Sequence, residues 1–156
     1  MEREGANGVG EFQKYRIEER VRWGDVDAAR IIFYGVYIRF FEIAETELFR
    51  AVGLPYGVMF DELDIWLPRA HLECDFRRAA RLDDLLEVSA YVGRVGRKSL
   101  RLDFEVRRNG EDELVATAHF VLVAVKRSTF ESVAVPEELK RRLAPYTRPA
   151  ETEGGD

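Results

Sequence analysis

The chain has 156 residues, of which 46% are hydrophobic and 34% charged, and its formal net charge is −5. These proportions are typical of a globular domain, and no uncharged run reaches the roughly 18 residues that a membrane-spanning helix requires. Because nucleic-acid-binding domains usually carry a surplus of basic residues, the acidic balance disfavours a nucleic-acid partner. The first residues contain no apolar signal-peptide core, so we expect a cytoplasmic protein.

Cysteine and histidine are scarce in the chain. The single cysteine, Cys74, excludes an intrachain disulfide and a cysteine-rich metal site. His71 and His119 lie far apart in the sequence, and a histidine-based metal site would need both of them together with carboxylates. We therefore expect no metal site. Both histidines are expected to be structural, and Cys74 is expected to be a small apolar strand residue rather than a nucleophile.

Composition divides the chain into three parts. Residues 1–12 are rich in Gly and Glu and are expected to be a flexible segment. Residues 147–156 are expected to form a disordered acidic tail. Between them, residues 13–146 contain neither a linker nor an internal repeat, which predicts a single domain.

The first expected elements are a strand and a long helix. Residues 15–23 alternate as a strand does. Apolar residues then recur at helical spacing within residues 36–53, namely Tyr37, Phe40, Phe41, Ala44, Leu48, Ala51 and Val52. Gly53 stands where a left-handed residue commonly ends a helix, and Pro55 follows it. We expect the apolar face of this helix to pack against a sheet.

The rest of the chain is mostly strand-like. Strands are expected over residues 69–77, 84–95, 99–108 and 113–126. The sequence Asn109–Gly110 is a strong hairpin signal between the last two. Residues 113–126 are apolar on both faces, so this strand should be central in its sheet. A short helix over residues 135–143, with Pro136 in its first turn, is expected to close the domain.

This order of elements predicts an α+β fold. Short connections between the last four strands make them mostly antiparallel neighbours, and the one long helix covers their sheet. A single such layer leaves a sheet face or edge without a partner. We therefore expect a homo-oligomer, at least a dimer.

The segment WGDVDAARIIFYGVY, residues 23–37, places two acids before an apolar run. It resembles the N-terminal signature of hotdog-fold acyl-CoA thioesterases of the 4-hydroxybenzoyl-CoA thioesterase type. The matching residues are Asp25, Asp27, Ile31, Ile32, Tyr34, Tyr37, Arg39 and Phe40. A second match is GRKSL, residues 96–100, and a weaker one is RAARLDDLLEV, residues 78–88. The resemblance covers about residues 15–145.

The resemblance implies a hotdog fold, in which an antiparallel sheet wraps around one long central helix. It also implies an active site at the subunit interface of a homodimer or homotetramer. Asp27 is implied as the catalytic carboxylate, acting as nucleophile or general base, and the backbone N–H of about Tyr34 as the group that polarises the thioester carbonyl. Arg97, Lys98 and Ser99 are implied to hold coenzyme A, which is part of the substrate, and no cofactor is implied.

These residues also suit thioester hydrolysis on chemical grounds. A carboxylate beside an apolar wall is suited to general-base or nucleophilic work. The free N–H groups at a helix start stabilise an oxyanion, and such a donor is typically worth roughly 3 kcal/mol of barrier. Arg97 and Lys98 can pair with the phosphates of coenzyme A.

Other interpretations of single residues remain open at this point. Asp25 is expected to organise its loop, as loop aspartates commonly do. Arg97 and Lys98 equally fit an ordinary solvated strand entry. A second hotdog subtype takes its carboxylate from the long helix, where Glu42 and Glu45 lie. We expect these two to be interfacial or solvated ion-pair partners instead.

Two alternative functions keep the same fold. The first is hydrolysis of acyl groups carried by an acyl carrier protein, although the acidic net charge disfavours an acidic partner. The second is binding of acyl-CoA without turnover. Arg30 motivates the second, because the family usually has a small residue there, and an arginine would narrow or charge the acyl pocket.

Overall fold

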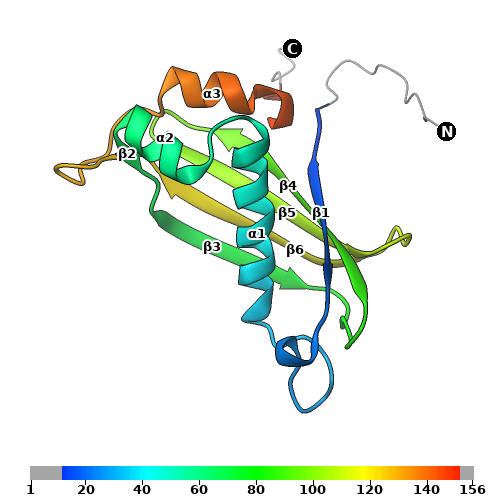
Figure 1. Ribbon diagram of the computed structural model, residues 1–156. Helices are drawn as coiled ribbons and strands as arrows, with labels where there is room; N and C mark the ends of the chain where they lie inside the picture. The colour runs from blue at the N-terminus through cyan, green and yellow to red at the C-terminus, as the bar shows by residue number, and fades with distance from the viewer. Residues whose placement is uncertain (1–11, 152–156) are drawn as a thin grey trace.

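Residues 12–151 are described by the computed structural model of the protein (Figure 1). In chain order the elements are β1 (Tyr15–Arg20), the 3-10 turn η1 (Trp23–Asp25), α1 (Val36–Ala51), α2 (Tyr56–Leu63), β2 (Ile65–Trp66), β3 (Arg69–Phe76), β4 (Leu85–Val95), β5 (Ser99–Arg108), β6 (Leu114–Val123), β7 (Val125–Lys126), α3 (Glu137–Leu143) and the 3-10 turn η2 (Ala144–Tyr146).

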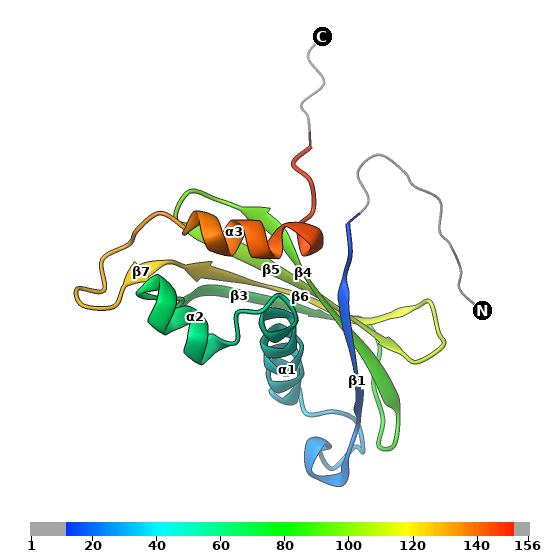
Figure 2. The ribbon, with the colours of Figure 1, turned by 45° about the horizontal axis from the view of Figure 1, so that its top comes forward.

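A five-stranded antiparallel sheet forms the centre of the molecule. Its strand order is β1-β4-β5-β6-β3, and β2 and β7 form a separate two-stranded pair. Helix α1 crosses one face of the large sheet, as the two views in Figures 1 and 2 show. The predicted α+β architecture, with one long helix on an antiparallel sheet, is therefore confirmed.

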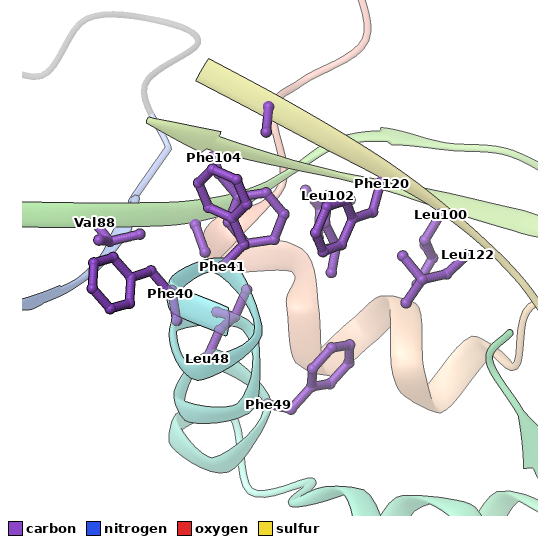
Figure 3. Close-up of a cluster of buried hydrophobic side chains, with 14 of the residues drawn as sticks. Phe40, Phe41, Leu48, Phe49, Val88, Leu100, Leu102, Phe104, Phe120 and Leu122 are labelled. Atoms are coloured by element: carbon purple, nitrogen blue, oxygen red, sulfur yellow. The ribbon is translucent and has the colours of Figure 1, made fainter. Parts of the chain in front are cut away.

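The hydrophobic core lies between α1 and the sheet. Figure 3 shows Phe40, Phe41 and Leu48 of α1 facing side chains from β4, β5 and β6. The Phe41 ring lies 4.9 Å from the ring of Phe104 and 6.0 Å from that of Phe120. The alternation of β5 and the helical spacing of α1 thus bury their apolar faces against each other, as the sequence predicts.

The end of α1 follows the predicted signal. Gly53 has φ +80°, and the Leu54 N–H donates to the Phe49 carbonyl at 2.9 Å. This left-handed turn ends the helix and redirects the chain toward α2.

Some element predictions were wrong in detail. The first strand ends at Arg20, because the chain turns into η1 where a strand was expected to continue to residue 23. Residues 113–126 form two strands, β6 and β7, although β6 does lie inside the sheet, between β5 and β3, as its two apolar faces predict. The elements α2 and β2 were not predicted, because each is too short to show a clear period.

The expected terminal segments are only partly described. Residues 1–11 and 152–156 lie outside the described residues. The acidic tail was expected to begin at residue 147, but the Arg148 N–H donates to the Val92 carbonyl at 2.8 Å, so the chain follows β4 beyond that point. At the other end, the Phe12 ring packs 5.2 Å from the Tyr91 ring. None of the helices within residues 12–151 has the length and apolar composition needed to span a membrane.

Candidate active site

A pocket of about 380 Å³ opens where the chain enters α1. One wall comes from the loop between η1 and α1, and the other from the segment that follows β3. Its lining consists of Asp27, Ile31, Ile32, Tyr34, Tyr37, Phe76, Arg77, Arg78, Ala79 and Ala80. Asp27 and part of the apolar run that follows it therefore border one shared space.

Backbone hydrogen bonds hold the two walls together. The Ile32 N–H donates to the Ala80 carbonyl at 2.8 Å, and the Leu82 N–H to the Arg30 carbonyl at 3.2 Å. Within the loop, the Asp27 N–H donates to the Ile31 carbonyl at 3.0 Å. These bonds set the position of Asp27 relative to the start of α1.

Asp27 combines a loop role with a position in the pocket. Its Oδ1 accepts a hydrogen bond from the Ala29 N–H at 2.8 Å, which is the loop-capping role that spacing alone favours. Within the described residues, Oδ2 has no hydrogen-bond partner, so one oxygen is available to a ligand. The side chain is exposed in the single chain.

Asp25 has the structural role expected of it. The side chain is buried, and its Oδ2 accepts a hydrogen bond from the Arg22 N–H at 2.8 Å. Its backbone carbonyl accepts one from the Phe33 N–H at 3.0 Å, and Arg39 lies 4.0 Å from its Oδ1. Asp25 thus fastens both ends of the loop that carries Asp27.

Just before α1, the backbone N–H of Tyr34 is available as a hydrogen-bond donor. Gly35 precedes the helix and offers no side-chain cap. The Tyr37 N–H donates to the Tyr34 carbonyl at 3.3 Å, whereas no group in the described residues accepts from the Tyr34 N–H itself. An N–H group of this kind at a helix start is suited to bind a developing negative charge. Tyr34 and Asp27 line the same pocket.

Tyr37 forms the inner wall of the pocket. Burial raises the pKa of its phenol to about 12, so the hydroxyl stays protonated at neutral pH. Its ring packs 5.4 Å from that of Phe76, at the end of β3. This wall is aromatic and uncharged.

The segment Arg97–Ser99 does not meet Asp27 within one chain. Arg20 pairs with Leu85, so the loop with Asp27 leaves the sheet beside the start of β4. Residues 97–99 follow the end of β4, and at about 3.3 Å per residue this strand spans roughly 35 Å. In Figure 1 the end of β4 lies near α3, whereas the loop before α1 lies at the opposite end of the molecule. Locally, Lys98 Nζ donates to Ser132 Oγ at 3.4 Å.

Two basic residues beside the pocket were missed. Arg77 and Arg78 contribute to its lining, and Arg78 forms an ion pair with Glu113 at 3.0 Å. The one feature of the sequence that could have indicated them is that two arginines stand together at the end of a predicted strand. Only the contact between residues 30–32 and 80–82 reveals that this strand end adjoins the loop.

Glu45 on α1 was expected to be an interfacial or solvated ion-pair partner. It forms an ion pair, but its side chain is not solvated. Its side chain is fully buried and forms an ion pair with Arg69, while its Oε2 has no partner in the described residues. Burial raises the pKa of this carboxyl, and the nearby Arg69 guanidinium opposes the rise. Glu45 also lines a second pocket of about 350 Å³ with Ile38, Leu72 and Phe60. Glu42, by contrast, is exposed.

The structure brings the two histidines together despite their distance in the sequence. The rings of His71 and His119 lie 5.4 Å apart on neighbouring strands. Cys74 is half-buried, and burial raises the pKa of its thiol to about 11. This makes the thiolate scarce at neutral pH, in keeping with the expectation that Cys74 is not a nucleophile.

The fold and the pocket together define a class of protein: an α+β domain with one long helix on an antiparallel sheet, and a carboxylate beside the start of that helix. Residues 21–143 match the family described as the thioesterase-like superfamily, and the chain belongs to this family.

Named relatives agree with this assignment. An acyl-CoA thioesterase, YbgC, from Haemophilus influenzae is 31% identical over 121 residues, which cover 78% of this chain and 88% of that protein. A 1,4-dihydroxy-2-naphthoyl-CoA hydrolase from Synechococcus elongatus is 27% identical over 127 residues, covering 81% of this chain and 92% of that protein. The crystal structure of a 1,4-dihydroxy-2-naphthoyl-CoA thioesterase from Synechocystis shares the fold, with a TM-score of 0.77 and 18% identity over 85% of this chain and 96% of that one. The prediction of a hotdog-fold thioesterase is thus confirmed.

Proposed function

We propose that the protein hydrolyses acyl-CoA thioesters to a free acid and coenzyme A, with Asp27 as the catalytic carboxylate. The observation that carries this proposal is that Asp27 and Tyr34 line one pocket, where Asp27 has an oxygen and Tyr34 a backbone N–H without a partner in the described residues. Membership of the thioesterase-like superfamily supports it, as do the activities in the names of the relatives.

The proposed chemistry divides between these two groups. The thioester carbonyl oxygen accepts a hydrogen bond from the Tyr34 N–H. Asp27 either takes a proton from a water molecule that attacks the carbonyl carbon, or attacks that carbon itself. The Tyr34 N–H then holds the oxyanion. Breaking of the C–S bond releases the coenzyme A thiolate, which takes up a proton. In the nucleophilic route, water then hydrolyses the acyl-Asp27 anhydride.

The substrate's coenzyme A portion is proposed to bridge two copies of the chain. Within the described residues, one edge of β3 pairs with β6 and its other edge has no strand beside it. Antiparallel pairing of two β3 edges reverses the second copy, so that the far end of its sheet approaches this chain's pocket. Residues 97–99 of the second copy then bind the coenzyme A portion beside this pocket, together with Arg77 of this chain.

Exposed apolar side chains beside β3 support such a homodimer. Ile38, Leu72 and Phe76 are 45%, 44% and 53% exposed, although all three lie next to the core between α1 and β3. A second copy of the chain would cover them.

The acyl group is proposed to occupy the aromatic side of the pocket. Tyr34, Tyr37 and Phe76 line it, and about 380 Å³ accommodates an aryl group or a medium-length chain. Among the named relatives, the 1,4-dihydroxy-2-naphthoyl-CoA hydrolase acts on an aryl thioester. We expect aryl substrates to be turned over faster than long-chain ones.

Thiol release from a panel of short, medium, long and aromatic acyl-CoAs tests the function and the catalyst together. Asp27→Asn is the matched variant, because the amide oxygen can still accept the hydrogen bond from Ala29 while the charge is lost. We expect its kcat to fall at least about a hundredfold with folding unchanged. Reactions are also run with Cys74→Ala, so that the protein's own thiol does not contribute to the signal.

The outcomes separate the alternatives. Equal activity of wild type and Asp27→Asn would place the carboxylate elsewhere, and Glu45→Gln is then the next variant. Binding of acyl-CoA without turnover by the wild type would favour a non-catalytic acyl-CoA-binding protein. If the protein hydrolysed only thioesters of acyl carrier protein, its substrate would be the acylated carrier protein and not acyl-CoA.

A further inference from the structure

A second group of chemically reactive side chains lies on the sheet face that turns away from α1. His119 alternates on β6 with Ala118 and Phe120, which belong to the core beneath α1. Glu73 on β3 pairs directly with His119, and His71 precedes Glu73 by two residues. Side chains two residues apart share a strand face, and paired residues on neighbouring strands lie about 5 Å apart. The register of β3 and β6 therefore brings all three side chains together.

The three side chains present their ligand atoms to a common point. Glu73 Oε2 lies 3.5 Å from His71 Nε2 and 3.7 Å from His119 Nε2. All three ligand atoms are within 4.8 Å of one another. In a tetrahedral zinc site, bonds of about 2.0–2.1 Å separate neighbouring ligand atoms by about 3.4 Å. Two of the three separations are close to this value already, and rotation of the exposed His71 side chain can shorten the third.

The surroundings of this group favour a cation. A hollow of about 130 Å³ beside His119 is lined by four carboxylates, those of Glu73, Asp75, Asp103 and Glu105. Asp103 and Glu105 form ion pairs with basic side chains. In the part of the chain that the structure describes, Glu73 and Asp75 contact no lysine or arginine. Negative charge thus remains next to the two imidazoles.

We propose that His71, Glu73 and His119 form a binding site for one divalent transition-metal ion of the zinc class, with water completing the coordination. Two imidazole nitrogens and one carboxylate oxygen are a donor set that Zn²⁺ accepts, whereas Mg²⁺ and Ca²⁺ prefer all-oxygen sites. The ion joins the edge strand β3 to β6 from the face opposite α1. This site is separate from the pocket that contains Asp27, so it does not depend on the proposed function.

Isothermal titration calorimetry of the full chain with zinc chloride tests this site. The protein carries no affinity tag and is first treated with EDTA and dialysed. We expect one Zn²⁺ per chain, and no measurable heat with Mg²⁺. His71→Ala, Glu73→Gln and His119→Ala should each weaken zinc binding at least about tenfold. Glu62→Gln is the matched control, because it removes an exposed carboxylate from α2 and should bind zinc as the wild type does.

A spectroscopic measurement gives a second readout. Co²⁺ in place of Zn²⁺ should produce visible absorption bands with the wild type and with Glu62→Gln, and not with His71→Ala. His71 and Glu73 are exposed, so the variants at these positions test the site even if His119→Ala fails to fold. The proposal is wrong if the wild type binds no zinc, or if the His71 and Glu73 variants bind it as tightly as the wild type.

Discussion

Two aspartates separated by one residue play different parts in this protein. Asp25 is buried and bonded at both its side chain and its carbonyl, whereas Asp27 is exposed and has one oxygen without a partner in the described residues. Of the two, only Asp27 lines the pocket. Asp25 thus holds the loop in place, whereas Asp27 keeps one oxygen available in the pocket.

Arg30 stands where the resemblance to hotdog thioesterases implies a small residue, and its backbone conformation is one that favours glycine. Its φ is +60°, a left-handed conformation that costs a residue with a Cβ atom about 1–2 kcal/mol. The side chain is exposed and does not line the pocket, so the expectation that it narrows or charges the acyl site was wrong.

We predict that Arg30→Gly is more stable than Arg30→Ala by about 1 kcal/mol, because only glycine avoids the left-handed strain. Urea denaturation of both variants measures the difference, and Arg30→Ala controls for loss of the side chain itself. Thiol release should be unchanged in both. Equal stability of the two variants would show that the backbone at residue 30 relaxes.

The buried carboxyl of Glu45 predicts a pH dependence of stability. Burial raises its pKa above the ordinary value of 4.5, although Arg69 and the Tyr56 hydroxyl oppose the rise and exposed Glu42 adds to it. The folded state therefore holds this proton more tightly than the unfolded state does. Above about pH 4.5 the contribution of Glu45 to stability falls as pH rises through the raised pKa.

Glu45→Gln removes this titration. We expect the variant to gain stability relative to the wild type between pH 5 and pH 8, whatever constant offset the lost ion pair to Arg69 adds. Urea denaturation at both pH values gives the comparison. A stability difference that is the same at pH 5 and pH 8 would contradict the argument.

At the scale of single elements, β4 depends on a glycine at an irregularity in its pairing with β5. The register shifts between Val92 and Arg94. A Cβ atom at Gly93 would lie 1.5 Å from Asp103 Oδ2, which Arg101 holds at 3.1 Å. No side chain fits there unless this ion pair moves.

Gly93→Ala is therefore expected to lower the free energy of unfolding by roughly 1–3 kcal/mol, the usual range for overpacking. Gly57→Ala in α2 is the matched control, because no atom lies within 4 Å of its added Cβ. It should stabilise the protein by roughly 0.5–1 kcal/mol. If Gly93→Ala and Gly57→Ala shift the thermal midpoint equally, the close approach of Asp103 has no energetic consequence.

At the scale of the whole molecule, β3 has an uncovered edge within the described residues, with exposed apolar side chains beside it. The segment Arg97–Ser99 and Asp27 lie at opposite ends of β4, so under the proposed function they act on one substrate across two copies of the chain. Homodimerisation and activity should therefore fail together.

Leu72→Asp places a charge in this uncovered region and is expected to yield a folded monomer with strongly reduced thiol release. Phe130→Asp is the matched control. Phe130 is 61% exposed and lies in the loop after β7, so its variant should keep the wild-type mass and activity. Light scattering coupled to size-exclusion chromatography measures the mass. A monomeric wild type that hydrolyses acyl-CoA would refute the shared site.

Four features could be predicted from the amino-acid sequence alone: the long helix, the main strands, the loop with two acids and the resemblance to the thioesterase family. These features depend on local periodicity, on a glycine cap and on a short motif, and each of these signals lies within a short stretch of the sequence. The short elements α2 and β2 could not be predicted, because a helix of eight residues and a strand of two show too little periodicity.

Which side chains come into contact could be known only from the three-dimensional fold. It buried Glu45 against Arg69, placed Arg77 beside Asp27, separated Asp27 from residues 97–99, and paired Glu73 with His119. Each of these outcomes depends on strand order and register. Both are set by packing between segments distant in sequence, because a shift of one residue would turn every side chain of a strand to the opposite face.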